Sequence, residues 1–309
     1  MIIFPQRTSR IKTYNRGSFT VGNRLMYSAR LEMENGDNIS LFSYDNFTFN
    51  EGSKITYQMT KKDDKTKTKL ISGGKPLIPL LDEIPITSLL FFDIETVRTE
   101  KDLKKGTPLY NSWLYKMRNE KATIPAKEKL YLDDAPLFPE YGKIACITIG
   151  MIKQDGLAYL KSYSGTEEEI LESFLDVLDK CNPKIRLCGF VSNKFDIPFV
   201  VRRLLVNRIR VPDFLDVFDV KPWELGKRFI DIHDLWRNLG YHGSSLLGVA
   251  TALGLPSPKS KLDGSKVSDA FYAGEIEEIV EYCELDVLTT INIARHLYDQ
   301  PPLEDFIKN

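Results

Sequence analysis

Apolar and polar positions alternate with a period of two along the first quarter of the chain. Turn residues such as Glu34-Asn35-Gly36-Asp37 separate five short stretches of this kind. Such alternation is typical of strands with one buried face. The expected strands cover residues 18–21, 24–33, 38–44, 54–59 and 67–72. Together they suggest a small barrel over residues 1–74, and an oligonucleotide-binding (OB) barrel is one fold of this type.

The pattern changes near residue 75. Residues 75–85 hold three prolines and follow neither a helical nor a strand period, which is typical of a linker. A continuous apolar run then begins with Leu89-Leu90-Phe91-Phe92. Four large apolar residues in succession fit a strand that is covered on both faces, as in the centre of an α/β sheet.

Strand and helix patterns alternate over the rest of the chain. Strands are expected at residues 143–152, 157–163, 186–190 and from 229. Helices are expected from Thr166, which starts a capping box, after 196, at 246–253 and at 275–297. This order predicts an α/β fold with a mixed sheet flanked by helices, and we place the second domain at residues 86–309.

The chain of 309 residues carries 42 basic and 43 acidic residues, so a nucleic-acid surface would have to come from local clustering. The first 74 residues interleave basic and aromatic side chains, a pattern that suits single-strand binding. The alternative is that the aromatics form a core and the lysines a solvated loop. The residues concerned are Arg7, Arg10, Lys12, Arg16, Lys61, Lys62, Lys65, Lys67, Lys69, Tyr14, Phe19, Tyr27, Phe42, Tyr44 and Phe47.

No apolar run approaches the length of a membrane span, and the first residues lack the layout of a signal peptide. We therefore expect a cytoplasmic protein without a membrane partner. The four cysteines, Cys146, Cys181, Cys188 and Cys283, show no Cys-x-x-Cys spacing. We interpret them as reduced core residues, neither zinc ligands nor a disulfide framework.

Two carboxylates end the apolar run. Asp93 and Glu95 are separated by one residue, so on a strand both side chains point to the same side. Two anions placed in this way repel one another unless a cation lies between them. Mg²⁺ and Mn²⁺ prefer carboxylate oxygen, which makes a divalent ion the natural occupant. The alternative is a strand that merely ends in solvated acids.

Further acids follow downstream. Asp196 lies in a turn between an expected strand and an expected helix. Tyr282 and Asp286 are four residues apart in a strongly helical pattern, so they share one helix face. Each of these features alone is common on protein surfaces, but their joint occurrence after the acidic strand points to one site.

At this point the chain resembles a known family. The motifs are Phe-Asp-Ile-Glu-Thr at 92–96, Gly-Phe-x-x-x-x-Phe-Asp-Ile-Pro at 189–198 and Tyr-x-x-x-Asp at 282–286. They are similar to the three motifs of the tyrosine branch of the DEDD 3′→5′ exonucleases, which share a ribonuclease H-like fold. The likeness is to the proofreading domain of family B DNA polymerases and to the stand-alone predicted exonucleases related to it, and it covers about residues 86–297.

The resemblance implies roles for individual residues. It makes Asp93, Glu95, Asp196 and Asp286 ligands of two divalent ions, Mg²⁺ or Mn²⁺, and Tyr282 the residue that orients the attacking water. We expect substrate contacts from Thr96, Phe190, Asn193, Phe195, Gly264, Ser265 and Lys266. Residues 263–266 would meet a phosphate through main-chain amides, or form a plain turn.

One position departs from the family pattern. The polymerase-type second motif usually has Asn two residues after its glycine, whereas this chain has Val191. Asn193 is the candidate to replace it. Asp231, His233 and Asp234 also cluster in sequence, and we assign them structural or substrate-positioning roles because the four-carboxylate set is already complete.

The stretch between Thr96 and Tyr141 is too long for a simple turn. Residues 109–118 predict a basic and aromatic helix that either covers substrate or packs on the sheet edge. Tyr131-Leu132-Asp133-Asp134 is similar to the Tyr-x-Asp-Asp of some polymerase palms, but no other palm motif accompanies it, and we assign it no role.

The expected function is metal-dependent 3′→5′ hydrolysis of single-stranded DNA in replication, proofreading or repair. Two alternatives stay open: a protein that binds single strands or 3′ ends without cutting them, and an exoribonuclease that acts on short RNA. A proofreading role would require a separate DNA polymerase or replisome protein as partner.

Overall fold

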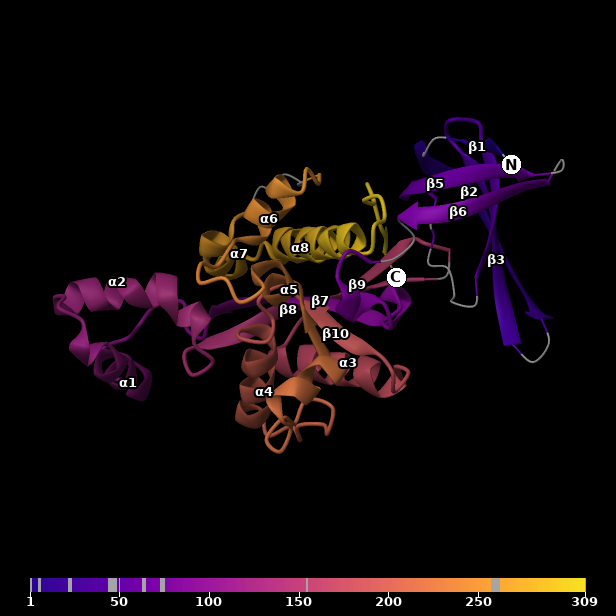
Figure 1. Ribbon diagram of the computed structural model, residues 1–309. Helices are drawn as coiled ribbons and strands as arrows, with labels where there is room; N and C mark the ends of the chain where they lie inside the picture. Colours follow the sequence, from indigo (N-terminus) through magenta and orange to yellow (C-terminus); the bar gives the residue numbers. More distant parts are fainter. Residues whose placement is uncertain are drawn as a thin grey trace. The chain divides into compact units, whose positions relative to one another are not determined.

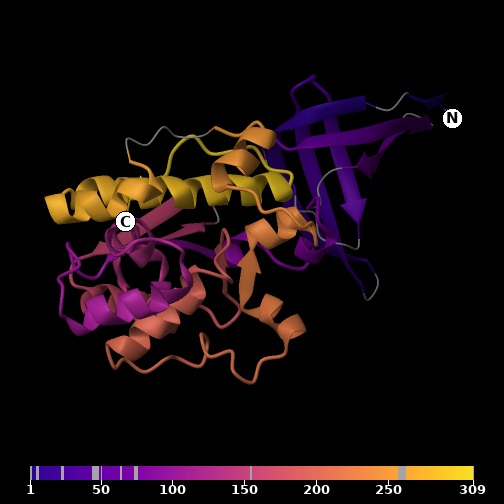
Figure 2. The same ribbon diagram turned by 90° about the vertical axis from the view of Figure 1, so that its left-hand side faces the viewer.

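The computed structural model describes residues 2–4, 7–21, 24–43, 49, 51–62, 65–72, 76–153, 155–256 and 262–308 (Figures 1 and 2). The chain divides into two compact units. One comprises Met1–Ile86 and Asn292–Pro302, and the other comprises Thr87–Ile291 and Leu303–Asn309. Each unit contains its own sheet.

The strands are β1 (Ile2–Ile3), β2 (Arg7–Val21), β3 (Arg24–Met33), β4 (Asn38–Ser43), β5 (Lys54–Lys62), β6 (Lys65–Ser72), β7 (Leu89–Arg98), β8 (Gly142–Ile152), β9 (Ala158–Ser164), β10 (Arg186–Gly189), β11 (Phe229–Asp231) and β12 (Ile307–Lys308). The helices are α1 (Pro108–Lys116), α2 (Ile124–Asp134), α3 (Glu167–Lys180), α4 (Asp196–Val206), α5 (Ile232–Arg237), α6 (Leu246–Ala252), α7 (Val267–Ala273) and α8 (Ile276–Leu297).

The first unit is an antiparallel sheet in the order β1-β5-β2-β3-β4, with β6 also paired to β5. β2 begins at Arg7, well before the strand expected at 18–21, because its first residues pair with β5 and the rest with β3. Some Cα atoms of β4 lie within 8 Å of Cα atoms of β6. No pairing joins them among the described residues, so the sheet is not shown to close into the expected barrel.

The aromatic residues of this unit divide between its core and its surface. Tyr14 and Tyr27 pack against a buried cluster that includes Leu31. Phe19 and Phe42 are exposed, and their ring centroids lie 6.1 Å apart. Tyr44, Phe47, Lys75 and the side chains of Lys62 and Lys69 lie outside the described residues. Part of the set thus packs against a core, and binding of single strands by this unit stays a prediction.

The second unit is a mixed α/β structure around a six-stranded sheet in the order β11-β10-β7-β8-β9-β12. β10 runs parallel to β7 and to β11, whereas β8 is antiparallel to both β7 and β9. This arrangement confirms the expected α/β class with a mixed sheet and flanking helices. β7 lies inside the sheet, between β10 and β8.

Helices cover both faces of this sheet, as the apolar run at its centre predicts (Figure 1). Phe92 and Ile94 of β7 point into the cluster formed with α3 and α4. Val97 belongs to the cluster on the other face, which α7 and α8 complete. α8 packs so closely that a Cβ on Gly150 of β8 would lie 3.0 Å from a methyl group of Val287. Residues 93 and 95 thus face α8.

Local signals account for several element boundaries. The Thr166 hydroxyl and the Glu169 carboxylate form both halves of a capping box at the start of α3. α1 and α2 lie side by side, and the Tyr131–Asp134 sequence belongs to α2, which was not expected (Figures 1 and 2). Within the described part of the chain, no helix has the length and apolar character that a membrane crossing requires.

Candidate active site

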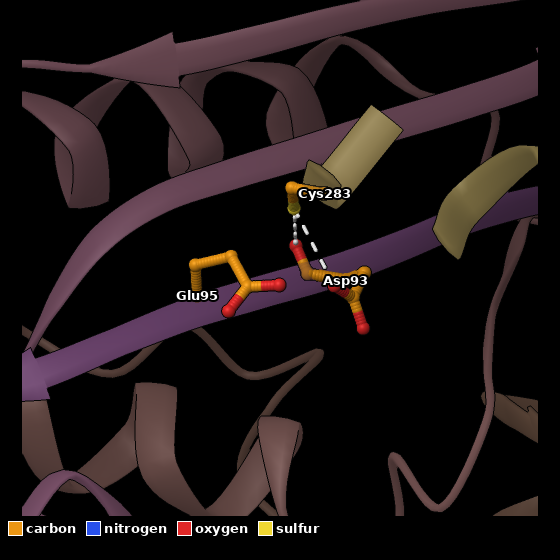
Figure 3. Close-up of side chains that lie close together, drawn as sticks. All are labelled: Asp93, Glu95 and Cys283. Carbon is orange, nitrogen blue, oxygen red and sulfur yellow. Dashed lines mark hydrogen bonds between the residues drawn. The ribbon is translucent and has the colours of Figure 1, made fainter. Parts of the chain in front are cut away.

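Asp93 and Glu95 lie on one face of β7. Asp93 is paired with Thr148 and Glu95 with Cys146, and the register with β8 shifts only after Glu95. The two-residue spacing is therefore undisturbed, and both carboxylates point toward α8. One ligand atom from each lies within 4.8 Å of the other and of the Cys283 sulfur (Figure 3).

α8 contributes Tyr282, Cys283 and Asp286. The Tyr282 hydroxyl and the Asp286 carboxylate, one helical turn apart, lie close enough to shift each other's pKa. The Cys283 sulfur lies 3.4 Å from Oδ2 of Asp93 and 3.5 Å from its main-chain oxygen. Cys283 is buried as expected, but it also belongs to the site, which the sequence did not indicate (Figure 3).

Asp196 enters from the first turn of α4 and is 4 % exposed. Its Oδ1 accepts a hydrogen bond of 3.2 Å from the main-chain amide of Ile94, between the two acids of β7. This contact joins segments that are 102 residues apart in sequence. The second motif, which contains Asp196, therefore meets the first motif at β7.

The four carboxyl groups have raised pKa values. Burial is the largest cause for Asp93, and the negative charges of the other three groups raise it further. Burial again comes first for Glu95, followed by the charge of Asp286. Burial raises the pKa of Asp196 to about 7 and that of Asp286 to about 6. Among the described residues, no positively charged side chain contributes to these shifts.

This donor set fits divalent cations. Glu95 is 8 % exposed, and no hydrogen bond to its carboxylate is found among the described residues. The ionised form of a buried carboxylate without a partner is costly, and a bound cation removes that cost. Oxygen donors of this kind suit Mg²⁺ or Mn²⁺. Asp93, Glu95, Asp196 and Asp286 are the residues that could hold them.

Tyr282 is held in its neutral form. Burial raises the pKa of its hydroxyl well above the ordinary value, and the nearby charges of Asp286 and Glu95 add to the shift. The group is therefore a hydrogen-bond donor at any working pH. Gly264 lies beside it, because a Cβ at that position would be 3.8 Å from the Tyr282 oxygen. The 263–266 segment thus borders the site.

Asp231 shapes the loop that leads to Asp196. The residue is 4 % exposed, and its carboxylate accepts main-chain hydrogen bonds of 3.0 Å from Val191 and from Asn193. It also caps α5 by accepting from the amide of His233 at 3.0 Å. Val191 adopts a left-handed conformation with φ of 63°. These contacts assign Asp231 a structural role, one of the two roles expected for it.

The other expected substrate residues lie in different surroundings. The ring centroids of Phe190 and His233 lie 5.3 Å apart, and those of Phe195 and Phe199 lie 5.5 Å apart. The Thr96 hydroxyl donates to the Pro136 carbonyl, so it already has a partner within the fold. Ser265 and Lys266 are exposed, and both contact the side chain of Asp263. Asn193 lines a cavity of about 480 Å³ beside α4.

Cys283 is the site residue that the sequence reasoning missed. It lies three residues before Asp286, a spacing that places two side chains on neighbouring positions of one helix face. That spacing is a signal in the sequence. The apolar pattern around the cysteine, however, predicts a residue of the core.

Residues 139–294 match a family described as "Predicted 3'-5' exonuclease related to the exonuclease domain of PolB". The match spans half of the chain, and the chain belongs to this family. The matched segment includes Asp196, Tyr282 and Asp286. Asp93 and Glu95 precede it, and the sheet brings them to the same place.

Among solved structures, the chain is similar to the family B DNA polymerase from the hyperthermophilic archaeon Pyrobaculum calidifontis, with 13 % identity and a TM-score of 0.44. The similarity covers 93 % of this chain and 46 % of the polymerase, so the chain spans less than half of that protein's length. No curated protein matches the chain.

Proposed function

We propose that this protein is a metal-dependent 3′→5′ exonuclease that hydrolyses phosphodiesters at the 3′ end of single-stranded DNA. The observation that carries the proposal is the convergence of four acids from β7, α4 and α8, all with raised pKa values. Family membership supports the reaction class. The strand order and the helices on both faces are consistent with the ribonuclease H-like fold that the resemblance implies.

The acids would hold two divalent ions. A ligand atom of Asp93 lies within 4.8 Å of one of Glu95, and the charges of Asp286 and Asp196 act on both groups. When bound, divalent ions lower the pKa of water to supply a nucleophile and stabilise the charge that develops on the phosphoryl oxygens. The protein's own contribution is to fix the carboxylates and exclude bulk water around them.

Tyr282 is the proposed positioning group for the attacking water. Its neutral hydroxyl can donate a hydrogen bond, and it lies near the carboxylates of Asp286, Glu95 and Asp93, whose charges help to raise its pKa. A group with so high a pKa is a poor general base at neutral pH. The described residues therefore favour a tyrosine that orients water over one that removes its proton.

Substrate binding is proposed for residues on two sides of the acids. Gly264 lies next to Tyr282, and the exposed side chains of Ser265 and Lys266 follow it in the same short 3-10 helix, where they can meet a phosphate. Phe190, Asn193 and Phe195 belong to the loop before α4, where aromatic rings can stack on bases. Thr96 completes the proposed set. A separate DNA polymerase or replisome protein is the proposed partner for proofreading or repair.

The test is digestion of a 5′-labelled single-stranded DNA with Mg²⁺, with Mn²⁺ and with EDTA, resolved on a denaturing gel. The proposal predicts a ladder that shortens from the 3′ end only when a metal is present. The same sequence as RNA tells whether the sugar matters. An intact strand that shifts on a native gel would instead favour a protein that binds nucleic acid without cutting it.

A further inference from the structure

Cys283 places a sulfur atom among the acids of the site. Its Sγ is 3.4 Å from Oδ2 of Asp93, and a ligand atom from each of Asp93, Glu95 and Cys283 lies within 4.8 Å of the others (Figure 3). The cysteine is buried on α8, and both acids come from β7. Three potential metal ligands from two rigid elements thus surround one point.

The donor chemistry of this group differs from that of four carboxylates. Mg²⁺ binds oxygen and has little affinity for sulfur, whereas Zn²⁺ and Cd²⁺ accept thiolate together with carboxylate. Ligand atoms separated by less than about 5 Å can share one ion of this kind with small side-chain movements. The third donor therefore widens the range of ions that the group can bind.

A second observation points to a cation at the same place. Glu95 is 92 % buried, since only 8 % of its surface is exposed, and it has no hydrogen-bond partner among the described residues. Its carboxylate points toward Asp93 and Cys283 (Figure 3). An unpartnered buried carboxylate aimed at two other donors is satisfied when a cation binds between them.

We propose that Asp93, Glu95 and Cys283 form a mixed oxygen and sulfur site for a thiophilic divalent cation such as Zn²⁺ or Cd²⁺. On binding, the thiol loses its proton to the solvent, a sulfur–metal bond forms, and each carboxylate contributes one oxygen. The site overlaps with the one assigned to the Mg²⁺ or Mn²⁺ ions because it uses two of the same acids. Inhibition by zinc is the consequence, and that consequence rests on the proposed exonuclease function.

The binding test uses Cd²⁺, because its bond to thiolate gives an ultraviolet charge-transfer band. The full chain, free of other divalent ions, is titrated with Cd²⁺ as wild type, as Cys283→Ser and as the matched control Cys181→Ser. Cys181 lies half-buried at the end of α3. The proposal predicts a saturable band in wild type and in the Cys181 variant, and its loss in Cys283→Ser, with circular dichroism confirming that each variant folds.

A competition experiment on the wild type tests the overlap without any mutation. Excess Mn²⁺ should remove the band, since both ions need Asp93 and Glu95. An absent band in wild type, an unchanged band in folded Cys283→Ser, or a band that excess Mn²⁺ leaves intact would each overturn the proposal.

Hydrolysis of DNA with Mg²⁺ alone is measured separately on the wild-type protein. A cadmium site without hydrolysis would leave this inference standing and reject the exonuclease. Hydrolysis without a Cys283-dependent band would support the exonuclease and reject the mixed oxygen and sulfur site.

Discussion

The Asp231 carboxylate accepts a 3.0 Å hydrogen bond from the main-chain amide of Val191, whose backbone is left-handed with φ of 63°. A β-branched residue is rarely found in that conformation, because its Cβ substituents crowd the backbone. The Asp231 carboxylate also accepts a hydrogen bond from the main-chain amide of Asn193. The two bonds keep the loop in a shape that a valine at position 191 does not favour. That loop ends at Asp196, one of the four acids.

The strain at Val191 predicts a stabilising substitution. Asn tolerates the left-handed region, and the related polymerase motif usually has Asn here, so Val191→Asn should raise the free energy of unfolding by about 1 kcal/mol. Thermal unfolding followed by circular dichroism measures the change. Val217→Asn is the control, because Val217 is not among the residues with positive φ. A lower melting temperature for Val191→Asn would show that the valine side chain contributes more than its strain costs.

The raised carboxyl pKa values predict how stability depends on pH in EDTA. Burial raises the pKa of Asp196 to about 7 and that of Asp286 to about 6, both from 3.8. The folded protein therefore keeps protons that the unfolded chain has already lost, and stability falls as pH rises from about 4 to about 7. Melting temperatures across this range measure the effect.

Divalent metal should reverse that trend. Cations bind the ionised carboxylates of the folded state, so Mg²⁺ or Mn²⁺ should raise the melting temperature most at pH 7 and above. Asp196→Asn should flatten the slope measured in EDTA, because it removes the group that titrates at about pH 7. A melting temperature in EDTA that rises between pH 4 and 7 would contradict the assignment of these buried acids.

Removal of the Tyr282 hydroxyl should slow hydrolysis without unfolding the protein. Tyr282→Phe keeps the ring and loses the donor that orients water, so we expect kcat to fall by about ten- to a hundredfold with little change in KM. Steady-state rates on single-stranded DNA measure both. Tyr159→Phe on β9 is the matched control, since its hydroxyl contacts only Asp155 in the described structure. Equal rates for the two variants would remove Tyr282 from the mechanism.

Local patterns predicted much of the second unit. The alternation along β7 placed Asp93 and Glu95 on one face, and helical spacing placed Tyr282 beside Asp286. The capping box at Thr166 located the start of α3. Each of these features depends on residues that are close in sequence, so a reader of the sequence alone can find it.

Other features depend on contacts between distant segments. The left-handed backbone of Val191 is maintained by Asp231, 40 residues further on. β12 has only two residues and is defined by its pairing with β9. The length of β2 follows from two different partner strands. Cys283 belongs to the site because α8 packs against β7. No local pattern encodes such contacts.

In the proposed mechanism, the acids gathered at β7 hold the ions that drive 3′ hydrolysis. The most direct test measures release of 3′ nucleotides by wild type, Asp93→Asn and Asp176→Asn in Mg²⁺, together with Mn²⁺ binding by calorimetry. Asp176 is an exposed residue of α3, so it controls for the chemical change alone.

We expect Asp93→Asn to fold, to lose Mn²⁺ affinity and to retain less than about a thousandth of the activity, while Asp176→Asn matches wild type. A folded Asp93→Asn variant that binds Mn²⁺ and cuts DNA like wild type would contradict it.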